Sequence, residues 1–340
     1  MTGEVKTFIR NQRDYLKKNQ SALTIDADTH LTDIRSLPKE LSQRFEENSD
    51  YYHGRPVDTE IVLKQMGLAA VDMALSWQNP AATAYSDDAS FNYDSLLAAN
   101  EYVVSSARRN PQRIIPAAWT DPKALGLAKA RQLAEHCVNS LGVGIVKINP
   151  AQNQFPINSP DVMELVEAII ASGAIVAFHY GSDTPYTPAA GLEEVASRFA
   201  DVPFLAVHMG GGGASFEEAE DMYMESRKLG LRRPNLYFVL SAKRDTHMES
   251  DFVTYQLAGA PYNEHLLCAS DSPYGNPVFQ FAGFRAMLEG FLSASDHPDQ
   301  RVRDNPGLFD RSAIQNYLGG NMARLMVRVY DRLLDKQGKA

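Results

Sequence analysis

Only two cysteines occur in the sequence, Cys137 and Cys268, and their spacing matches neither a disulfide framework nor a zinc finger. Basic residues are not in excess: the formal net charge of −9 argues against binding to nucleic acid or to an anionic membrane surface. No apolar run approaches the ~18–20 residues that cross a bilayer. Residues 1–20 carry scattered charges without the apolar centre of a signal peptide. These absences indicate a globular protein of the cytoplasm, with no membrane or nucleic-acid partner.

Short apolar runs alternate with longer amphipathic segments along the chain. The apolar runs are eight in number and span residues 23–29, 68–75, 113–119, 143–149, 174–180, 203–209, 235–241 and 265–271. The segments between them, such as residues 159–173, have the periodicity of helices. Strands that alternate with helices are typical of parallel strands joined by crossovers. Eight such units over 340 residues predict an α/β fold, a single (β/α)8 or TIM barrel, rather than an open sheet.

The two ends of the chain extend this barrel. A charged helical leader is predicted over residues 1–22, and the barrel domain over residues 23–340, including a C-terminal helical extension from residue 312. Either end packs on the barrel or forms a contact in a homo-oligomer, because barrels of this kind are often oligomers. No linker supports the alternative of two domains. The longest irregular stretches, residues 31–57 and 76–93, follow the first two strands and are expected over the barrel mouth.

The first apolar run carries acids where a buried strand is expected to be apolar. Asp26, Asp28 and His30 are two residues apart, so on a strand they point to one face. A buried carboxylate is unfavourable unless it is hydrogen-bonded, paired with a cation or bound to a metal. We therefore expect Asp26 to bond a neighbouring strand, and Asp28 and His30 to share a metal ion near the barrel axis.

Three further polar residues, His179, His208 and Asp271, end strands on the same side of the predicted barrel. Active sites of such barrels lie at the C-terminal ends of the strands. Imidazole and carboxylate groups are ligands that zinc, manganese and iron accept. With the first strand, His179 and Asp271 complete a predicted site for one divalent ion, zinc first, with manganese or iron as alternatives. The alternative role for Asp271 is a turn cap, because Ser-Asp-Ser-Pro favours capping.

Four motifs follow one another along the chain: IDADTH at 25–30, AFHYG at 177–181, VHMGG at 207–211 and ASDSPYG at 269–275. Over about residues 23–290 the chain resembles the amidohydrolase superfamily, and most closely its amidohydrolase-2 group of metal-dependent TIM-barrel hydrolases and decarboxylases. The first strand of that family usually carries His-x-His, so the Asp-x-His of this chain makes the site more anionic. The resemblance implies a metal-binding set and a catalytic partner, namely Asp28, His30, His179 and Asp271 as ligands with His208 beside them.

Candidate substrate-binding residues end other strands. Trp77 and Trp119 end the second and third predicted strands; they form an aromatic wall for a planar substrate, or else cap the core. Lys147 ends the fourth strand and faces the site. In some branches of the superfamily a lysine there is carboxylated and bridges two metals, but pairing with a metal-binding carboxylate is favoured here. Lys243 and Arg244 follow the seventh strand, and Arg244 is predicted to bind a substrate carboxylate unless this loop is only solvated.

Together these residues predict a metal-dependent hydrolase of a small cyclic or aromatic carboxylate derivative, such as a lactone or an amide. A metal-activated water attacks the carbonyl group, Asp271 takes the proton of that water, and His208 stabilises the carbonyl oxygen. The alternative is a non-oxidative decarboxylase, in which Asp271 or His208 protonates the carbon that loses carbon dioxide. A third interpretation is a barrel that only binds a ligand, although every predicted metal position holds a competent residue.

Overall fold

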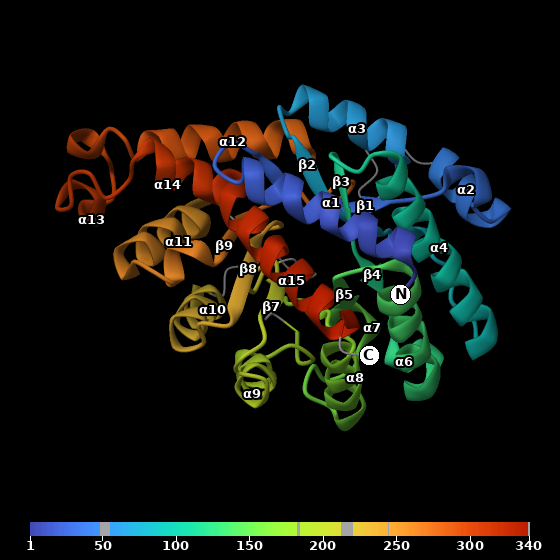
Figure 1. Ribbon diagram of the computed structural model, residues 1–340. Coiled ribbons are helices and arrows are strands. Elements are labelled where there is room, and N and C mark those ends of the chain that lie inside the picture. Colours follow the sequence, from blue (N-terminus) through green and yellow to red (C-terminus); the bar gives the residue numbers. More distant parts are fainter. Residues whose placement is uncertain (48–54, 182–183, 212–219, 244, 339–340) are drawn as a thin grey trace.

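The computed structural model describes residues 1–47, 55–181, 184–211, 220–243 and 245–338, and it forms a barrel of parallel strands surrounded by helices (Figure 1). Every predicted apolar run overlaps a strand, and the predicted (β/α)8 barrel is confirmed. The strands are β1 (Ile25–Leu31), β2 (Met73–Gln78), β3 (Ile114–Pro116), β4 (Ala118–Trp119), β5 (Ile145–Ile148), β6 (Ile175–His179), β7 (Phe204–Val207), β8 (Leu236–Leu240) and β9 (Leu266–Cys268).

The third predicted strand is divided into β3 and β4, which pair on different sides. β3 pairs with β2, whereas β4 pairs with β5, and from there each strand pairs with the next as far as β9. Pro116 ends β3, and because proline has no N–H it cannot donate to the ladder. The next residue, Ala117, still donates its N–H to Ser76 O at 2.8 Å, so the wall of the barrel continues across the division.

The barrel closes between β9 and β1 through the segment that follows β9. Thr29 and Ser272 form a parallel bridge, and His30 N donates to Ser272 O at 2.7 Å. This closure brings the end of β1 against the residues that follow the last strand, where Asp271 lies.

Helices cover the outside of the barrel (Figure 1). Several begin at polar caps: Ser159 Oγ, for example, accepts a hydrogen bond from Val162 N at the start of α8. In the part of the chain that the structure describes, no helix is long and apolar enough to cross a membrane. The α-helices are α1 (Gly3–Asn19), α2 (Lys39–Glu46), α3 (Thr59–Leu68), α4 (Ala89–Arg109), α5 (Pro122–Leu125), α6 (Leu127–His136), α7 (Pro150–Asn153), α8 (Pro160–Ala171), α9 (Ala189–Arg198), α10 (Glu220–Arg232), α11 (Asp245–Ala258), α12 (Pro277–Gly290), α13 (Gln300–Arg303), α14 (Arg311–Gln315) and α15 (Asn321–Gly338).

One predicted strand boundary and two predicted irregular stretches differ from the structure. The second strand was expected over residues 68–75, but Leu68 ends α3 and the strand begins only at Met73. Between them Ala70 takes the left-handed conformation, with φ of +49°, which turns the chain from helix to strand. The stretch 76–93 is also more regular than expected, because β2, the 3-10 turn η2 (Pro80–Ala82) and α4 occupy much of it.

The stretch 31–57 holds the 3-10 turn η1 (Ile34–Ser36) and helix α2, so it too is less irregular than expected. Its residues 48–54 lie outside the described part of the chain.

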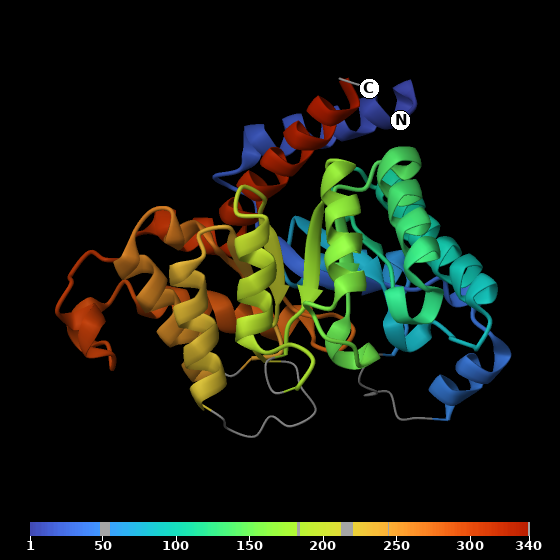
Figure 2. The same cartoon turned by 90° about the horizontal axis from the view of Figure 1, so that it is seen from below.

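The two ends of the chain form neighbouring helices on one end of the barrel. Figure 2 shows α1 and α15 side by side there, with the loops that follow the strands at the opposite end. Gln12 joins α1 to the barrel, because its amide donates to Pro111 O and Ile114 O at 2.7 Å each. Its oxygen accepts a hydrogen bond from Tyr330 of α15, also at 2.7 Å. The predicted leader is therefore a helix that shares the barrel core.

A π-helical turn, η6 (Asn316–Gly320), leads into α15 and packs against the beginning of β1. The approach is so close that a Cβ atom on Gly319 would lie 2.0 Å from Leu23 O and 2.7 Å from Ile25 N. Only glycine fits between these two backbones.

Candidate metal centre and active site

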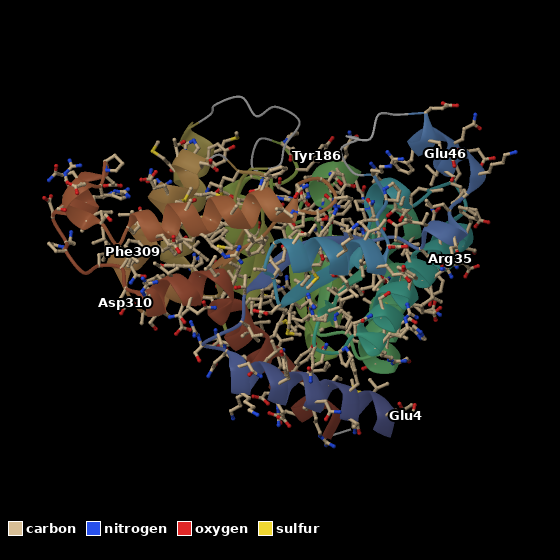
Figure 3. The ribbon with its side chains drawn as sticks, turned by 90° about the horizontal axis from the view of Figure 1, so that it is seen from above. Glu4, Arg35, Glu46, Tyr186, Phe309 and Asp310 are labelled. Atoms are coloured by element: carbon tan, nitrogen blue, oxygen red, sulfur yellow. The ribbon has the colours of Figure 1, made fainter. Side chains whose placement is uncertain are left out.

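A cavity of about 260 Å³ lies at the C-terminal ends of the strands. In Figure 3 the loops on that side, which include Tyr186, lie at the end of the molecule opposite Glu4 of α1. Most of the side chains that line the cavity are polar, as expected for an active site rather than a core. They include six residues at or just after the ends of separate strands, namely His30, Lys147, His179, His208, Lys243 and Asp271.

Strand β1 is irregular where it passes the site, because its register with β2 shifts between Asp26 and Thr29. Asp26 is fully buried and, as expected, bonds a neighbouring strand: it accepts from Ser270 N at 2.9 Å and from Ser270 Oγ at 2.5 Å. Burial raises the pKa of Asp26 to about 7. These two hydrogen bonds fix the backbone immediately before Asp271.

His30 presents one ring nitrogen to the cavity. Its Nδ1 lies 2.8 Å from Gln78 O, and because a carbonyl oxygen only accepts, Nδ1 carries the proton and Nε2 the lone pair. Nε2 lies 3.6 Å from Asp28 Oδ1 and 3.3 Å from Asp271 Oδ1. Burial and the charge of Lys147 lower the pKa of His30 to about 4, so the ring is neutral at pH 7. A neutral imidazole is the form that binds metals.

Asp28 lies beneath the cavity and is held at both oxygens. Trp77 Nε1 donates to Oδ1 at 2.8 Å, Ser241 Oγ donates to Oδ2 at 3.0 Å, and Lys147 Nζ lies 3.5 Å from Oδ1. Burial acts to raise the pKa of Asp28, but Lys147 and the neighbouring imidazoles outweigh it, so the pKa lies below its usual range. Burial and the charge of Asp28 raise the pKa of Asp271.

The two remaining histidines contact each other. Because Ser241 gives its proton to Asp28, its oxygen accepts the Nδ1–H of His208, which lies 2.9 Å away. His208 Nε2 then carries a lone pair and lies 3.2 Å from His179 Nδ1. Burial lowers the pKa of His208. In its neutral form His208 is therefore a proton acceptor on the side of His179.

Unusual backbone conformations mark the ends of three consecutive strands. His208, Ala242 and Asp271 follow β7, β8 and β9, and their φ angles are +77°, +47° and +58°. Such conformations are unfavourable for residues with a side chain and collect at functional sites. The turn after β7 also needs glycine, because a Cβ atom on Gly211 would lie 2.6 Å from Ala242 O. These strained residues therefore lie at the end of the barrel that carries the polar cavity.

The donor set fits a divalent cation. Asp28, His30 and Asp271 each offer one ligand atom, and these atoms lie within 4.8 Å of one another. His30 Nε2 and the Asp28 carboxylate are acceptors in the states derived above, and Asp271 joins them when it is ionised, so the three repel each other unless a cation or a proton lies between them. Two carboxylates and an imidazole are ligands for zinc, manganese or iron. His179 is not part of this cluster; it lines the same cavity, beside His208.

The predicted substrate residues separate into two groups. Trp119 and Lys147 line the cavity. Trp77 does not: it is fully buried, and Lys147 Nζ lies 4.0 Å from the centre of its ring. Trp77 supports Asp28 and Lys147 from below. Arg244 lies outside the described residues, and its neighbour Lys243 lines the cavity instead.

Some residues of the site escaped the sequence analysis. Ser241 joins Asp28 to His208, and its signal was its place directly after β8, level with the other strand-end residues. Tyr274 lines the cavity, and its ring packs edge-on against His30 with 5.4 Å between ring centres. It lies within the ASDSPYG motif, three residues after Asp271, but one sequence gives no sign of where its ring points.

A family model described as amidohydrolase matches residues 25–286. No curated protein matches the chain.

Solved structures with a similar fold cover nearly the whole chain. A 5-carboxyvanillate decarboxylase from Sphingomonas paucimobilis is 16% identical with a TM-score of 0.61, covering 90% of this chain and 99% of that one. A dihydroxybenzoic acid decarboxylase from Polaromonas sp. JS666, with bound manganese and an inhibitor, is 12% identical (TM-score 0.58; 89% and 96% covered). A probable 2-pyrone-4,6-dicarboxylic acid hydrolase from Acinetobacter baumannii is also 12% identical (TM-score 0.56; 89% and 98% covered). At these identities the similarity establishes the fold alone.

Proposed function

The chain belongs to the amidohydrolase family of metal-dependent enzymes, and from this premise we propose that it hydrolyses a small cyclic or aromatic carboxylate derivative. The bond that breaks is the C–O or C–N bond of a lactone, an amide or a similar group. One observation carries the proposal: three acceptor atoms, on Asp28, His30 and Asp271, converge at a cavity lined by polar and cationic side chains.

A single divalent ion is proposed at this point, with His179 as a fourth ligand. The cation supplies charge that polarises a carbonyl group and lowers the pKa of a water molecule toward ~7. Zinc is the ion that the sequence predicts, and manganese is the alternative that the two carboxylates favour. Lys147 pairs with Asp28 and, in this proposal, does not bridge a second ion. Metal analysis of protein purified without a chelator or a histidine tag distinguishes zinc from manganese, and one equivalent from two.

Proton transfer is assigned to Asp271, and stabilisation of the carbonyl oxygen to His208. The side chain of Asp271 is 13% exposed and that of Asp28 is 0% exposed, so Asp271 is the carboxylate that reaches a water molecule in the cavity. Asp271 takes the proton of the attacking water and passes it to the leaving group. For His208 to stabilise the carbonyl oxygen, its Nε2 would carry a proton taken up from solvent; it would then donate a hydrogen bond to that oxygen as negative charge develops there, and keep its proton.

Binding of the substrate carboxylate is assigned to the cationic side of the cavity. Lys147 and Lys243 both line it, and Arg244 stays a prediction. The buried Nε1–H of Trp119 has no hydrogen-bond partner among the described residues. A buried donor without a partner is unfavourable, so a substrate oxygen that reaches this N–H gains a hydrogen bond.

The polarity of the cavity favours hydrolysis over decarboxylation. Hydrolysis needs a water molecule and polar groups that move its protons, and the polar lining of the cavity provides such groups. The aromatic wall that would suit a decarboxylase is also smaller than the sequence predicted, because Trp77 lies beneath Lys147. Trp119 alone of the two tryptophans borders the cavity.

A decarboxylase of an aromatic or unsaturated acid is the second candidate, and the similarity of the fold to two decarboxylases favours it. In that reaction Asp271 or His208 protonates the carbon that carries the carboxylate, and the bond to carbon dioxide then breaks. The same lysines hold the carboxylate before it leaves.

Turnover in oxygen-18 water separates the two reactions. Metal-loaded protein is tested with cyclic and aromatic carboxylates that carry a lactone or an amide, and with the simple aromatic acids. We expect oxygen-18 in the product and no carbon dioxide, with a rate that falls by about 10² or more in Asp271→Asn, because the base is lost. Release of carbon dioxide without label would select the decarboxylase. Failure of the protein to bind any metal would contradict both proposed reactions.

The proposed enzyme acts on a small molecule. A cytoplasmic location and a homo-oligomeric state stay predictions, the first checked by fractionation and the second by light scattering.

A further inference from the structure

A second cavity, of about 400 Å³, lies beside the catalytic one. Turn η2 separates them, since Pro80 lines the catalytic cavity and Ala82 lines the second. Much of the second cavity is apolar, with Leu31, Phe91 and Ala99 among its lining residues. Its volume falls within the range of ~300–1,000 Å³ that is typical of small-molecule sites.

Two residues that line this cavity each carry a buried polar atom with no hydrogen-bond partner in the described part of the chain. The two atoms are Nε2 of Gln78, a residue 1% exposed, and Oγ1 of Thr32, a residue 6% exposed. The oxygen of the Gln78 side chain is already used, because it accepts from Thr83 Oγ1 at 2.5 Å. Native proteins rarely leave such groups unpaired, since each costs about 1–3 kcal/mol. The amide of Gln78 donates a hydrogen bond, and the hydroxyl of Thr32 either donates or accepts one. Together they suit a ligand oxygen that accepts from the amide and also forms a hydrogen bond with the hydroxyl.

Charge distinguishes the second cavity from the catalytic one. Asp33 and Asp94 line it, and among the described residues no lysine, arginine or histidine does so. The catalytic cavity, in contrast, is lined by two lysines and three histidines. An anion is therefore disfavoured in the second cavity and favoured in the first.

Gln78 connects the two cavities. Its backbone oxygen accepts a hydrogen bond from Nδ1 of His30 at 2.8 Å, and the residue is also among those that line the second cavity. A ligand that bonds the Gln78 amide therefore contacts the residue that orients His30.

We infer that the second cavity is a binding site for a neutral, largely apolar molecule that bears a hydroxyl or carbonyl oxygen. The apolar walls hold the body of the ligand, and the oxygen bonds Gln78 Nε2 and Thr32 Oγ1. Neither side chain takes part in the proposed hydrolysis, because only the backbone oxygen of Gln78 contacts the catalytic site, so this inference is tested apart from that reaction.

Calorimetric titration with three small probes tests the inference on the full-length protein. Phenol is neutral and has the oxygen, toluene lacks the oxygen, and benzoate carries a negative charge. We expect phenol to bind more tightly than toluene by about fivefold, since one hydrogen bond contributes about a factor of two to ten. Benzoate is expected to bind only in the catalytic cavity. Equal binding of phenol and toluene, or no binding of phenol at millimolar concentration, would overturn the inference.

Variants locate the bound phenol. Ala99→Leu fills the cavity from α4 and is expected to weaken phenol binding at least tenfold, whereas Ala89→Leu, on the same helix outside the cavity, leaves it unchanged. If phenol binding survives Ala99→Leu, phenol occupies another site and the inference is wrong.

Two threonines of similar burial provide a second, independent check. Thr32 has an unpaired hydroxyl, whereas Thr59, which is 7% exposed, bonds Ser106 Oγ at 2.6 Å. Thr32→Val is expected to keep the melting temperature and to weaken phenol binding about fivefold, because one hydrogen bond to the ligand is lost. Thr59→Val is expected to lower the melting temperature and to keep phenol binding. Unchanged phenol binding in Thr32→Val would contradict the assigned contact.

Discussion

At the scale of single residues, His30 and His208 have the same side chain, but their imidazole nitrogens have different hydrogen-bond partners. His30 has its Nδ1 proton committed to a backbone oxygen, and its Nε2 faces two carboxylates. His208 has its Nδ1 proton committed to Ser241, and its Nε2 faces another imidazole. The first arrangement is suited to a metal ligand and the second to a proton acceptor.

We therefore expect the two alanine variants to fail in different ways. His30→Ala should lose most of the bound metal, by about tenfold or more in content, because one of three converging ligand atoms is gone. His208→Ala should keep its metal and lose activity by about 10²–10⁴, the range for a general acid or base. His136→Ala, on α6 and away from the site, is the control for both measurements. Equal metal loss in the two site variants would refute the division of roles.

The sequence indicated the positions of the residues at strand ends. Side chains two residues apart lie on the same face of a strand, and parallel strands all end on the same side of the barrel. For Trp77 the sequence left two places open, the substrate wall or the core, and one sequence does not decide between them. The ring of Trp77 lies under Lys147 and its N–H bonds Asp28, and both contacts depend on how neighbouring strands are staggered. Ser241 was missed because a lone serine after an apolar run has no distinctive chemistry until its partners are known.

At the scale of elements, the eight predicted runs were found because buried parallel strands are continuous apolar segments. Their boundaries were less predictable. Leu68 and the two alanines after it are as apolar as a strand, yet they belong to the end of α3 and the turn beyond it, and only the pairing of Met73 with β1 settles where β2 begins. The division of the third strand follows from Pro116, which has no N–H to donate to a neighbouring strand. The sequence alone does not show which neighbouring strand would have accepted that hydrogen bond.

The contact between η6 and β1 predicts a strong effect of one methyl group. Gly319→Ala should destabilise the protein by several kcal/mol, because the new Cβ would overlap the backbone at Leu23 and the two elements would have to separate. Gly283→Ala, within α12, has nothing within 4 Å of its Cβ and should stabilise by about 0.5–1 kcal/mol through helix propensity. Urea unfolding of both variants measures the difference. A change of the same sign in the two would contradict the packing described for η6.

At the scale of the whole molecule, the ion should also act as a part of the fold. A ligand that binds only the folded chain stabilises it by about 2.7 kcal/mol at a hundredfold excess over its dissociation constant. We therefore expect chelation to lower the melting temperature by several degrees, and added metal to restore it, since about 1 kcal/mol corresponds to about 2–4 °C in a large domain. His30→Ala should melt at a temperature that chelation does not change. A melting temperature unaffected by chelation in the unmodified protein would mean that no ion is held there.

The pairing of α1 with α15 has a practical consequence for handling the enzyme. Both helices lie on the end of the barrel away from the strand-end loops (Figure 2), and Arg13 joins Asp331 across them at 3.0 Å. A linker fused before α1 or after α15 therefore leaves from the side opposite the catalytic cavity. A bead, an electrode or a reporter protein attached through either linker should leave the cavity mouth open to substrate.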